Sequence, residues 1–89
     1  MEFEWDENKN KTNIEKHKID FNDAKDVFED TKKRISTDNR IDYREERQKI
    51  IGKIYGTVIS VIFTVRNSVI RLISARKASL KEREEYDNQ

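Results

Sequence analysis

The pattern of apolar and polar residues changes at about residue 33 of the chain. Before this point the apolar residues are widely spaced, and several recur at intervals of three or four positions. After it they come in runs or on alternate positions. Spacing of three or four is typical of one face of a helix, whereas alternation is typical of a strand. The pattern therefore predicts helices first and a β-sheet afterwards.

The first part of the chain predicts one short strand and two helices. The strand covers Phe3–Trp5, with aromatic residues on alternate positions. Asp6 suits the N-cap of a helix over Glu7–Lys18, because its carboxylate can accept backbone N–H groups. Ile14 is the expected apolar contact of this helix. A second helix begins near Asn22 and carries its apolar residues at helical spacing, namely Ala24, Val27 and Phe28.

The second part predicts strands and a final helix. Arg34–Asp38 suits a short edge strand, and three longer β-rich runs follow at Arg47–Gly56, Thr57–Val65 and Ser68–Ala75. Short turns between the runs indicate an antiparallel arrangement, with the run that is apolar on both faces at its centre. The composition from Ala78 to Tyr86 is helical, with Leu80 and Tyr86 as inward contacts. The predicted order is β-α-α-β-β-β-β-α, an α+β fold in a single domain over residues 1–89.

Composition narrows the class of protein. The chain has 89 residues, of which 34% are hydrophobic and 42% charged, and it has no cysteine. This length supports one modest core, and the lack of cysteine excludes disulfides and thiolate chemistry. No window approaches the roughly 18 apolar residues of a membrane span. We therefore expect a soluble cytoplasmic protein that does not bind membranes.

Charge is distributed unevenly along the chain. Residues 47–83 contain nine basic residues and one acidic residue, Glu82, whereas residues 19–46 contain nine acidic and six basic residues. A basic half attracts polyanions such as nucleic acid, and an acidic segment suits a basic partner surface. The distribution indicates a nucleic-acid or protein partner.

The last predicted strand carries two arginines among apolar residues. In a regular strand Arg71 and Arg76 point to opposite faces, with Ser74 on the face of Arg76. Arg71 either forms a structural ion pair, with Glu45, Glu46 or a helix acid, or it binds phosphate through parallel N–H donors. We expect the strand to break after Ser74, which would turn Arg76 toward the face of Arg71.

Further cations have a periodic arrangement. Arg47, Lys49 and Lys53 alternate along their strand and therefore share one face. This stripe is either a solvated polar surface or part of a groove that follows an RNA backbone. The other basic residues that we assign to RNA binding are Arg66, Lys77, Lys9 and Lys16.

His17, the one histidine, is the candidate for proton transfer because its ordinary pKa lies near neutrality. It suits general acid or base catalysis of phosphodiester cleavage, and it equally suits stabilisation of a helix C-terminus. Trp5 suits the core or, alternatively, base stacking. The motifs typical of zinc proteases, nucleotide hydrolases and dinucleotide enzymes are absent from the sequence, so we expect no metal or cofactor.

Three ordered motifs resemble the BrnT family of toxins. They are FEWDENKNKTNIEKHKIDFNDAKDVFED (Phe3–Asp30), YREERQKIIGK (Tyr43–Lys53) and FTVRNSVIRLISARKASLKEREEY (Phe63–Tyr86). In one departure, Lys18 stands where the family usually has glycine after its histidine, so the turn after the first helix is expected to differ.

The resemblance implies a RelE-like fold and the toxin of a type II toxin–antitoxin pair, a metal-independent ribonuclease that arrests growth. It also implies a hetero-oligomer with a BrnA-type antitoxin, whose DNA-binding domain lets the complex repress its own operon. Motif positions matched by the resemblance, without assigned roles, are Glu46, Arg47, Arg71, Ser74 and Arg76.

A mechanism follows as a hypothesis. Metal-free cleavage must deprotonate the ribose 2′-OH, neutralise the phosphorane and protonate the 5′-oxygen. Arg71 and Arg76 are the candidates for the phosphorane, Glu46 or His17 for taking the proton, and His17 or a lysine for returning one. The alternatives are a module that binds nucleic acid or a partner without cleavage, and a structural subunit stable only with its partner.

Overall fold

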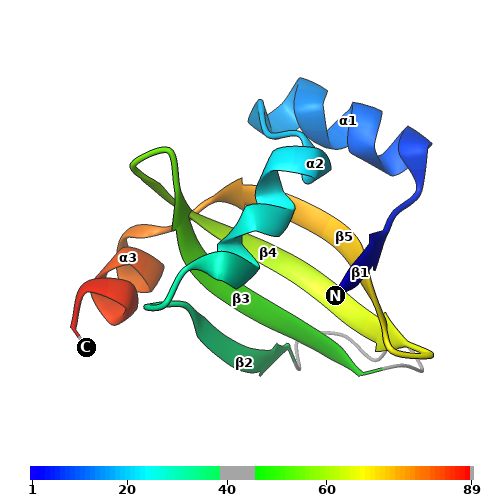
Figure 1. The fold of residues 1–89 in the computed structure, drawn as a ribbon. Helices are drawn as coiled ribbons and strands as arrows, with labels where there is room; N and C mark the ends of the chain where they lie inside the picture. The colour runs from blue at the N-terminus through cyan, green and yellow to red at the C-terminus, as the bar shows by residue number, and fades with distance from the viewer. Residues whose placement is uncertain (39–45, 89) are drawn as a thin grey trace.

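The computed structural model describes residues 1–38 and 46–88, and its elements follow the predicted order (Figure 1). The elements are β1 (Glu2–Glu4), α1 (Glu7–His17), α2 (Phe21–Ala24), the 3₁₀ helix η1 (Lys25–Glu29), β2 (Arg34–Asp38), β3 (Arg47–Ile54), β4 (Thr57–Arg66), β5 (Val69–Lys77) and α3 (Leu80–Asp87). The predicted α+β class is confirmed. No helix in the described ranges is long and apolar enough to cross a membrane.

The five strands form one sheet in the order β1-β5-β4-β3-β2. Strands β2 to β5 are antiparallel neighbours, as predicted. Strand β1 differs, because it pairs with β5 in parallel and places Glu4 directly opposite Arg71. The chain then passes through α1, α2 and η1 on one face of the sheet before it returns as β2 at the far end of this order (Figure 1). The sheet is therefore mixed rather than wholly antiparallel.

The core lies between the sheet and the helices α2 and η1. Phe21, Ala24 and Val27 are fully buried and pack against strand residues, which include Ile50, Val61, Phe63, Leu72 and Ala75. A Cβ at Gly52 would lie 3.0 Å from the Cβ of Val27, so the glycine permits the close approach of η1 to β3. Trp5 meets the ring of Phe21 edge-on at 6.2 Å between centroids, which favours its predicted role as core cover.

Helix α1 is attached to the sheet by asparagine and not by Ile14, so that prediction is wrong. Ile14 is 37% exposed, whereas Asn13 is buried. The Asn13 amide donates to the carbonyl of Ala75 at 2.8 Å and accepts its N–H at 3.0 Å. Strand β1 pairs with β5 only from Val69 to Arg71, so it does not reach the backbone of β5 at Ala75. Buried backbone groups there need a polar partner, which an apolar side chain cannot supply.

Lys18 keeps the left-handed conformation typical of a glycine at the end of a helix, so the expected difference in this turn is not found. Its φ is 59° and its ψ is 31°, and its N–H donates to the carbonyl of Ile14 at 2.9 Å. This conformation costs a residue with a side chain roughly 1–2 kcal/mol. Lys18 therefore holds a strained position.

Replacing Lys18 with glycine is expected to raise the free energy of unfolding by about 0.5–1 kcal/mol, because relief of strain exceeds the entropy lost by glycine. Urea denaturation measures the change. The control is Lys16→Gly inside α1, which is expected to lower the free energy of unfolding by about 1 kcal/mol. A loss of stability in Lys18→Gly would contradict the left-handed assignment.

Candidate nucleic-acid interface

A bulge in β5 changes which residues share a face of the sheet. Leu72 pairs with Phe63 and Ser74 pairs with Ile62, so Ile73 is an extra residue in β5. An extra residue reverses the alternation of the side chains that follow it. Arg71, before the bulge, and Ser74 and Arg76, after it, consequently share the face of the sheet opposite to α2.

The predicted break after Ser74 is therefore wrong, although its predicted consequence occurs. Strand β5 continues to Lys77, and Arg76 pairs with Ser60 of β4. The alternation changes at Ile73 and not at the start of the last helix. Arg71 and Arg76 thus lie on one face while both remain in the sheet.

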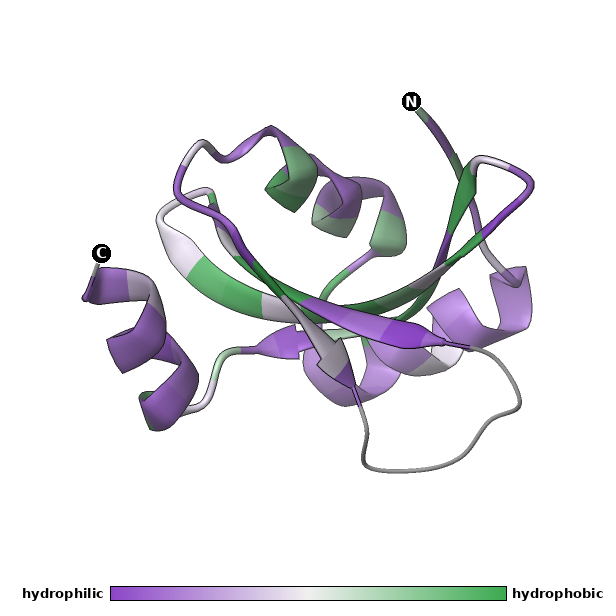
Figure 2. Ribbon diagram, turned by 90° about the horizontal axis from the view of Figure 1, so that it is seen from below, coloured by the Kyte–Doolittle hydropathy of each residue, from purple (hydrophilic) through white to green (hydrophobic). Residues whose placement is uncertain are grey.

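Strand β3 adds its cations to the same face. Lys49 pairs with Ile62, which is the partner of Ser74, so Lys49 and Ser74 lie on the same side. The predicted sharing of one face by three β3 cations is confirmed by this register. We call this surface the basic face, and it consists of Arg47, Lys49, Lys53, Arg71, Ser74 and Arg76. Figure 2 shows hydrophobic residues along the middle of the strands, whereas α3 is hydrophilic over most of its length.

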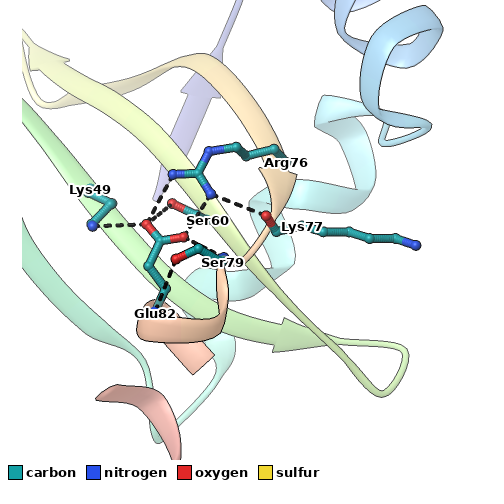
Figure 3. A network of polar contacts seen from close by, with 6 residues as sticks. All are labelled: Lys49, Ser60, Arg76, Lys77, Ser79 and Glu82. Carbon is teal, nitrogen blue, oxygen red and sulfur yellow. Dashed lines mark hydrogen bonds and ion pairs between the residues drawn. The ribbon is translucent and has the colours of Figure 1, made fainter. Parts of the chain in front are cut away.

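Glu82 of α3 organises part of the basic face (Figure 3). Its carboxylate is almost fully buried and accepts two N–H groups of Arg76, at 2.7 and 3.1 Å. Lys49 donates to it at 2.9 Å and the Ser60 hydroxyl at 3.2 Å. We call this group, with the N-cap residue of α3, the Glu82 network, and its members are Lys49, Ser60, Arg76, Ser79 and Glu82.

The start of α3 fixes the position of Glu82. The Ser79 hydroxyl accepts the N–H of Glu82 at 3.2 Å, and the Ser79 N–H donates to the Glu82 carboxylate at 2.8 Å. This reciprocal capping box holds the carboxylate toward the sheet. Tyr86 lies one turn further along the same face of α3 and is buried, as predicted, whereas Leu80 is 65% exposed. The inward prediction for Leu80 is wrong, because residues two positions apart lie on nearly opposite sides of a helix.

The Glu82 network has a net positive charge. Burial alone would raise the pKa of Glu82, but hydrogen bonds from Arg76, from the Ser79 N–H and from Lys49 outweigh burial and lower that pKa well below its usual range. Glu82 is therefore ionised at neutral pH, and one anion faces two cations. Three of the five guanidinium N–H groups of Arg76 donate to Glu82 and to the Lys77 carbonyl. Two remain for a ligand.

Arg71 forms an ion pair at the opposite end of the basic face. Its guanidinium lies 2.8 Å from the carboxylate of Glu4, and the two side chains are 29% and 42% exposed. An ion pair was one of the two expectations for Arg71, but the expected partner Glu46 is wrong; Glu45 lies outside the described residues. The parallel pairing of β1, which places Glu4 across from Arg71, accounts for the difference. Such an exposed pair contributes little stability, so Arg71 can exchange Glu4 for another anion.

Glu46 directly precedes β3, and its side chain is exposed. The Thr64 hydroxyl donates to the Glu46 carbonyl at 2.8 Å, and Thr64 pairs with Arg71. The backbone of Glu46 therefore borders the basic face.

His17, Lys9 and Lys16 lie on α1, on the other side of the β5 edge. They line a groove of about 390 Å³ between α1 and the β5 bulge, and Ser74 also lines it. Ser74 thus connects this groove to the basic face. The structure therefore brings six predicted residues together on the basic face and places three others, His17, Lys9 and Lys16, in the groove beside α1 (the α1 groove). Lys77 and Arg66 lie at strand ends, Lys77 in β5 and Arg66, which is exposed, in β4.

Sequence reasoning missed Glu82 as a site residue. Two signals point to it: the Ser79-x-x-Glu82 spacing of a capping box, and the position of Glu82 as the single acid among the basic residues of 47–83. Among the described residues, no group of three or more histidine, cysteine, aspartate or glutamate side chains is placed to hold a metal ion.

The comparisons with known proteins agree with the motifs. A family model described as the ribonuclease toxin BrnT of a type II toxin–antitoxin system matches residues 5–82. A search of curated proteins finds no significant match.

Proposed function

The chain belongs to the BrnT family of ribonuclease toxins of type II toxin–antitoxin systems, and we propose that it cleaves RNA without a metal ion at the basic face. The observation that carries this proposal is the position of Arg76. Its guanidinium is fixed by Glu82, is 35% exposed and retains donors for a phosphate. A preorganised cation is the group that a phosphorane needs.

The residues of the basic face supply the electrostatic part of the reaction. The ribose 2′-oxygen attacks the adjacent phosphorus, the bond from phosphorus to the 5′-oxygen breaks, and a cyclic phosphate and a 5′-hydroxyl result. Arg76 and Lys49 neutralise the charge of the phosphorane, and Arg71 binds a neighbouring phosphate after exchanging Glu4. Guanidinium is suited to this because it offers parallel donors and remains charged.

Proton transfer is assigned to His17 in preference to Glu46. His17 lines the α1 groove together with Ser74, which belongs to the basic face, so RNA that crosses the β5 edge would meet both. Glu46 precedes β3 and is not among the residues that line this groove. A histidine can take the 2′-OH proton or protonate the 5′-oxygen near neutral pH.

The same family membership supports a proposal about the antitoxin partner and the regulation of the operon. We propose that a BrnA-type antitoxin neutralises the toxin by forming a hetero-oligomer, and that the DNA-binding domain of the antitoxin directs the complex to its own operator. The toxin is expected to act in the cytoplasm, where its RNA substrate lies.

Incubation of the purified protein with RNA and EDTA is expected to yield shorter fragments with cyclic phosphate and 5′-hydroxyl ends. The ends distinguish attack by the 2′-oxygen from attack by water. RNA that is shifted in a gel without being shortened would support the binding module instead. Cleavage that requires added Mg²⁺ would contradict a metal-independent reaction. Adding the product of the neighbouring reading frame tests whether it is the antitoxin.

A further inference from the structure

A small cavity lies at the end of the sheet, between the β3–β4 turn and the C-terminus of α1. Its volume is about 200 Å³. Ile19 and Ile54 contribute apolar surface, His17, Lys18 and Lys77 contribute polar or cationic groups, and Asp23 contributes a carboxylate. The cavity therefore combines an apolar wall with an excess of cations.

Tyr55 lies at this cavity in an unusual conformation. It is 83% exposed, and it shares the two-residue turn with Gly56, both with positive φ values of 48° and 80°. Such a hairpin turn strongly favours asparagine followed by glycine, and a bulky residue with positive φ is an outlier. The ring contributes nothing to the core, so the position holds a strained residue whose aromatic side chain is presented to solvent.

The cavity is continuous with the groups assigned to cleavage. His17 lines both this cavity and the α1 groove. Arg76 and Lys77 are consecutive in β5, so their side chains point to opposite faces of the strand. Figure 3 shows the Lys77 side chain extending away from the Glu82 network. A chain that binds Arg76 can therefore reach Lys77 by passing over the end of β5.

We propose that this cavity and Tyr55 form a nucleotide subsite for single-stranded RNA, which flanks the cleavage site. A base stacks on the Tyr55 ring, and the phosphate next to that base contacts Lys77 and Lys18. The proposal rests on the proposed function. An aromatic ring beside cations is the arrangement with which proteins bind single strands, because every base has a face that stacks.

Single exposed hydrophobic side chains are common and need no explanation by themselves. Three observations set Tyr55 apart: its left-handed backbone, its place at a cavity lined by two lysines, and the presence of His17 in the lining of that cavity. Because stacking tolerates every base, the subsite is expected to add affinity without strong sequence preference.

The test replaces Tyr55 with asparagine, the residue that this turn favours. The variant should be at least as stable as the wild type, while its affinity for RNA should fall by about tenfold through loss of stacking. The probe is a short single-stranded RNA of mixed sequence with 2′-O-methyl riboses, which cannot be cleaved by 2′-oxygen attack. Fluorescence anisotropy measures affinity, and thermal denaturation measures stability.

Two further variants of the turn complete the test. Tyr55→Phe keeps the ring and is expected to bind like the wild type. Tyr55→Gly accepts the same backbone conformation and replaces Tyr55→Asn if the latter lowers the melting temperature. A loss of affinity in both ring-less variants, with affinity retained by Tyr55→Phe, supports the subsite.

Wild-type affinity in Tyr55→Asn would overturn the subsite. Arg76→Ala, measured in the same assay, shows whether the basic face itself binds RNA. If Arg76→Ala weakens binding and Tyr55→Asn does not, the proposed function is supported and the subsite is overturned. Absence of binding by the wild type would overturn both. Unchanged RNA affinity with loss of antitoxin binding would assign Tyr55 to a protein contact and overturn the subsite.

Discussion

Replacing Arg76 with alanine is expected to slow RNA cleavage by about 100- to 1,000-fold, the usual effect of removing one preorganised electrostatic stabiliser. The guanidinium is held by two hydrogen bonds to Glu82, so its orientation is established before RNA binds. Alanine removes both the charge and the donors that a phosphorane would use. Initial rates of cleavage of a labelled RNA measure the effect, and growth inhibition on expression should be lost in parallel.

One measurement of the fold and three control variants separate catalysis from folding in this experiment. Circular dichroism checks the fold of Arg76→Ala, and Arg83→Ala removes an exposed arginine of α3 with no expected effect on cleavage. Arg76→Lys keeps the charge without the planar fork and should have an intermediate rate. The double variant Arg76→Ala with Glu82→Gln avoids an uncompensated buried carboxylate. Full activity in a folded Arg76→Ala protein would show that the reaction occurs elsewhere.

The sequence predicted the strands well because alternation along a strand is a local property. The face shared by Arg47, Lys49 and Lys53 follows from a period of two residues, and the register confirms it. The bulge at Ile73 was not predictable in this way. A bulge depends on how two strands pair, and Ile73 has no local feature that distinguishes it from its apolar neighbours. The shared face of Arg71 and Arg76 therefore required the structure.

The helices were harder to predict because two of them contact the sheet through polar residues. Hydrophobic spacing selects Ile14 and Leu80, which are exposed, as well as Tyr86, which is buried; the polar residues Asn13 and Glu82 are buried beside the sheet without having been predicted. Asn13 satisfies the backbone of Ala75, and Glu82 collects donors from three strands and its own N-cap. Such roles depend on groups distant in sequence, so apolar periodicity cannot reveal them.

Replacing Glu82 with glutamine is expected to lower the free energy of unfolding by about 2–3 kcal/mol. Breaking a buried ion pair typically costs roughly 3–5 kcal/mol, and the loss is smaller here because Arg76 and Lys49 are 35% and 26% exposed. Without its anion Arg76 is less firmly oriented, so cleavage should also slow, though less than in Arg76→Ala. Urea denaturation gives the stability, and Glu84→Gln on the exposed side of α3 is the matched control.

The effect of Glu82→Gln should depend on pH in a defined direction. Since the pKa of Glu82 is lowered in the folded protein, its ionised form stabilises the fold at pH values above the ordinary carboxyl pKa of about 4.3. This contribution is lost as the pH falls from that value toward the pKa of the folded state. The stability difference between wild type and Glu82→Gln should thus be constant near neutrality and shrink below about pH 4. The pKa values of Asp20 and Asp30 are also lowered, but both residues are present in both proteins and cancel in the difference. A difference that stays constant down to the acid limit would mean that Glu82 acts through packing and not through its charge.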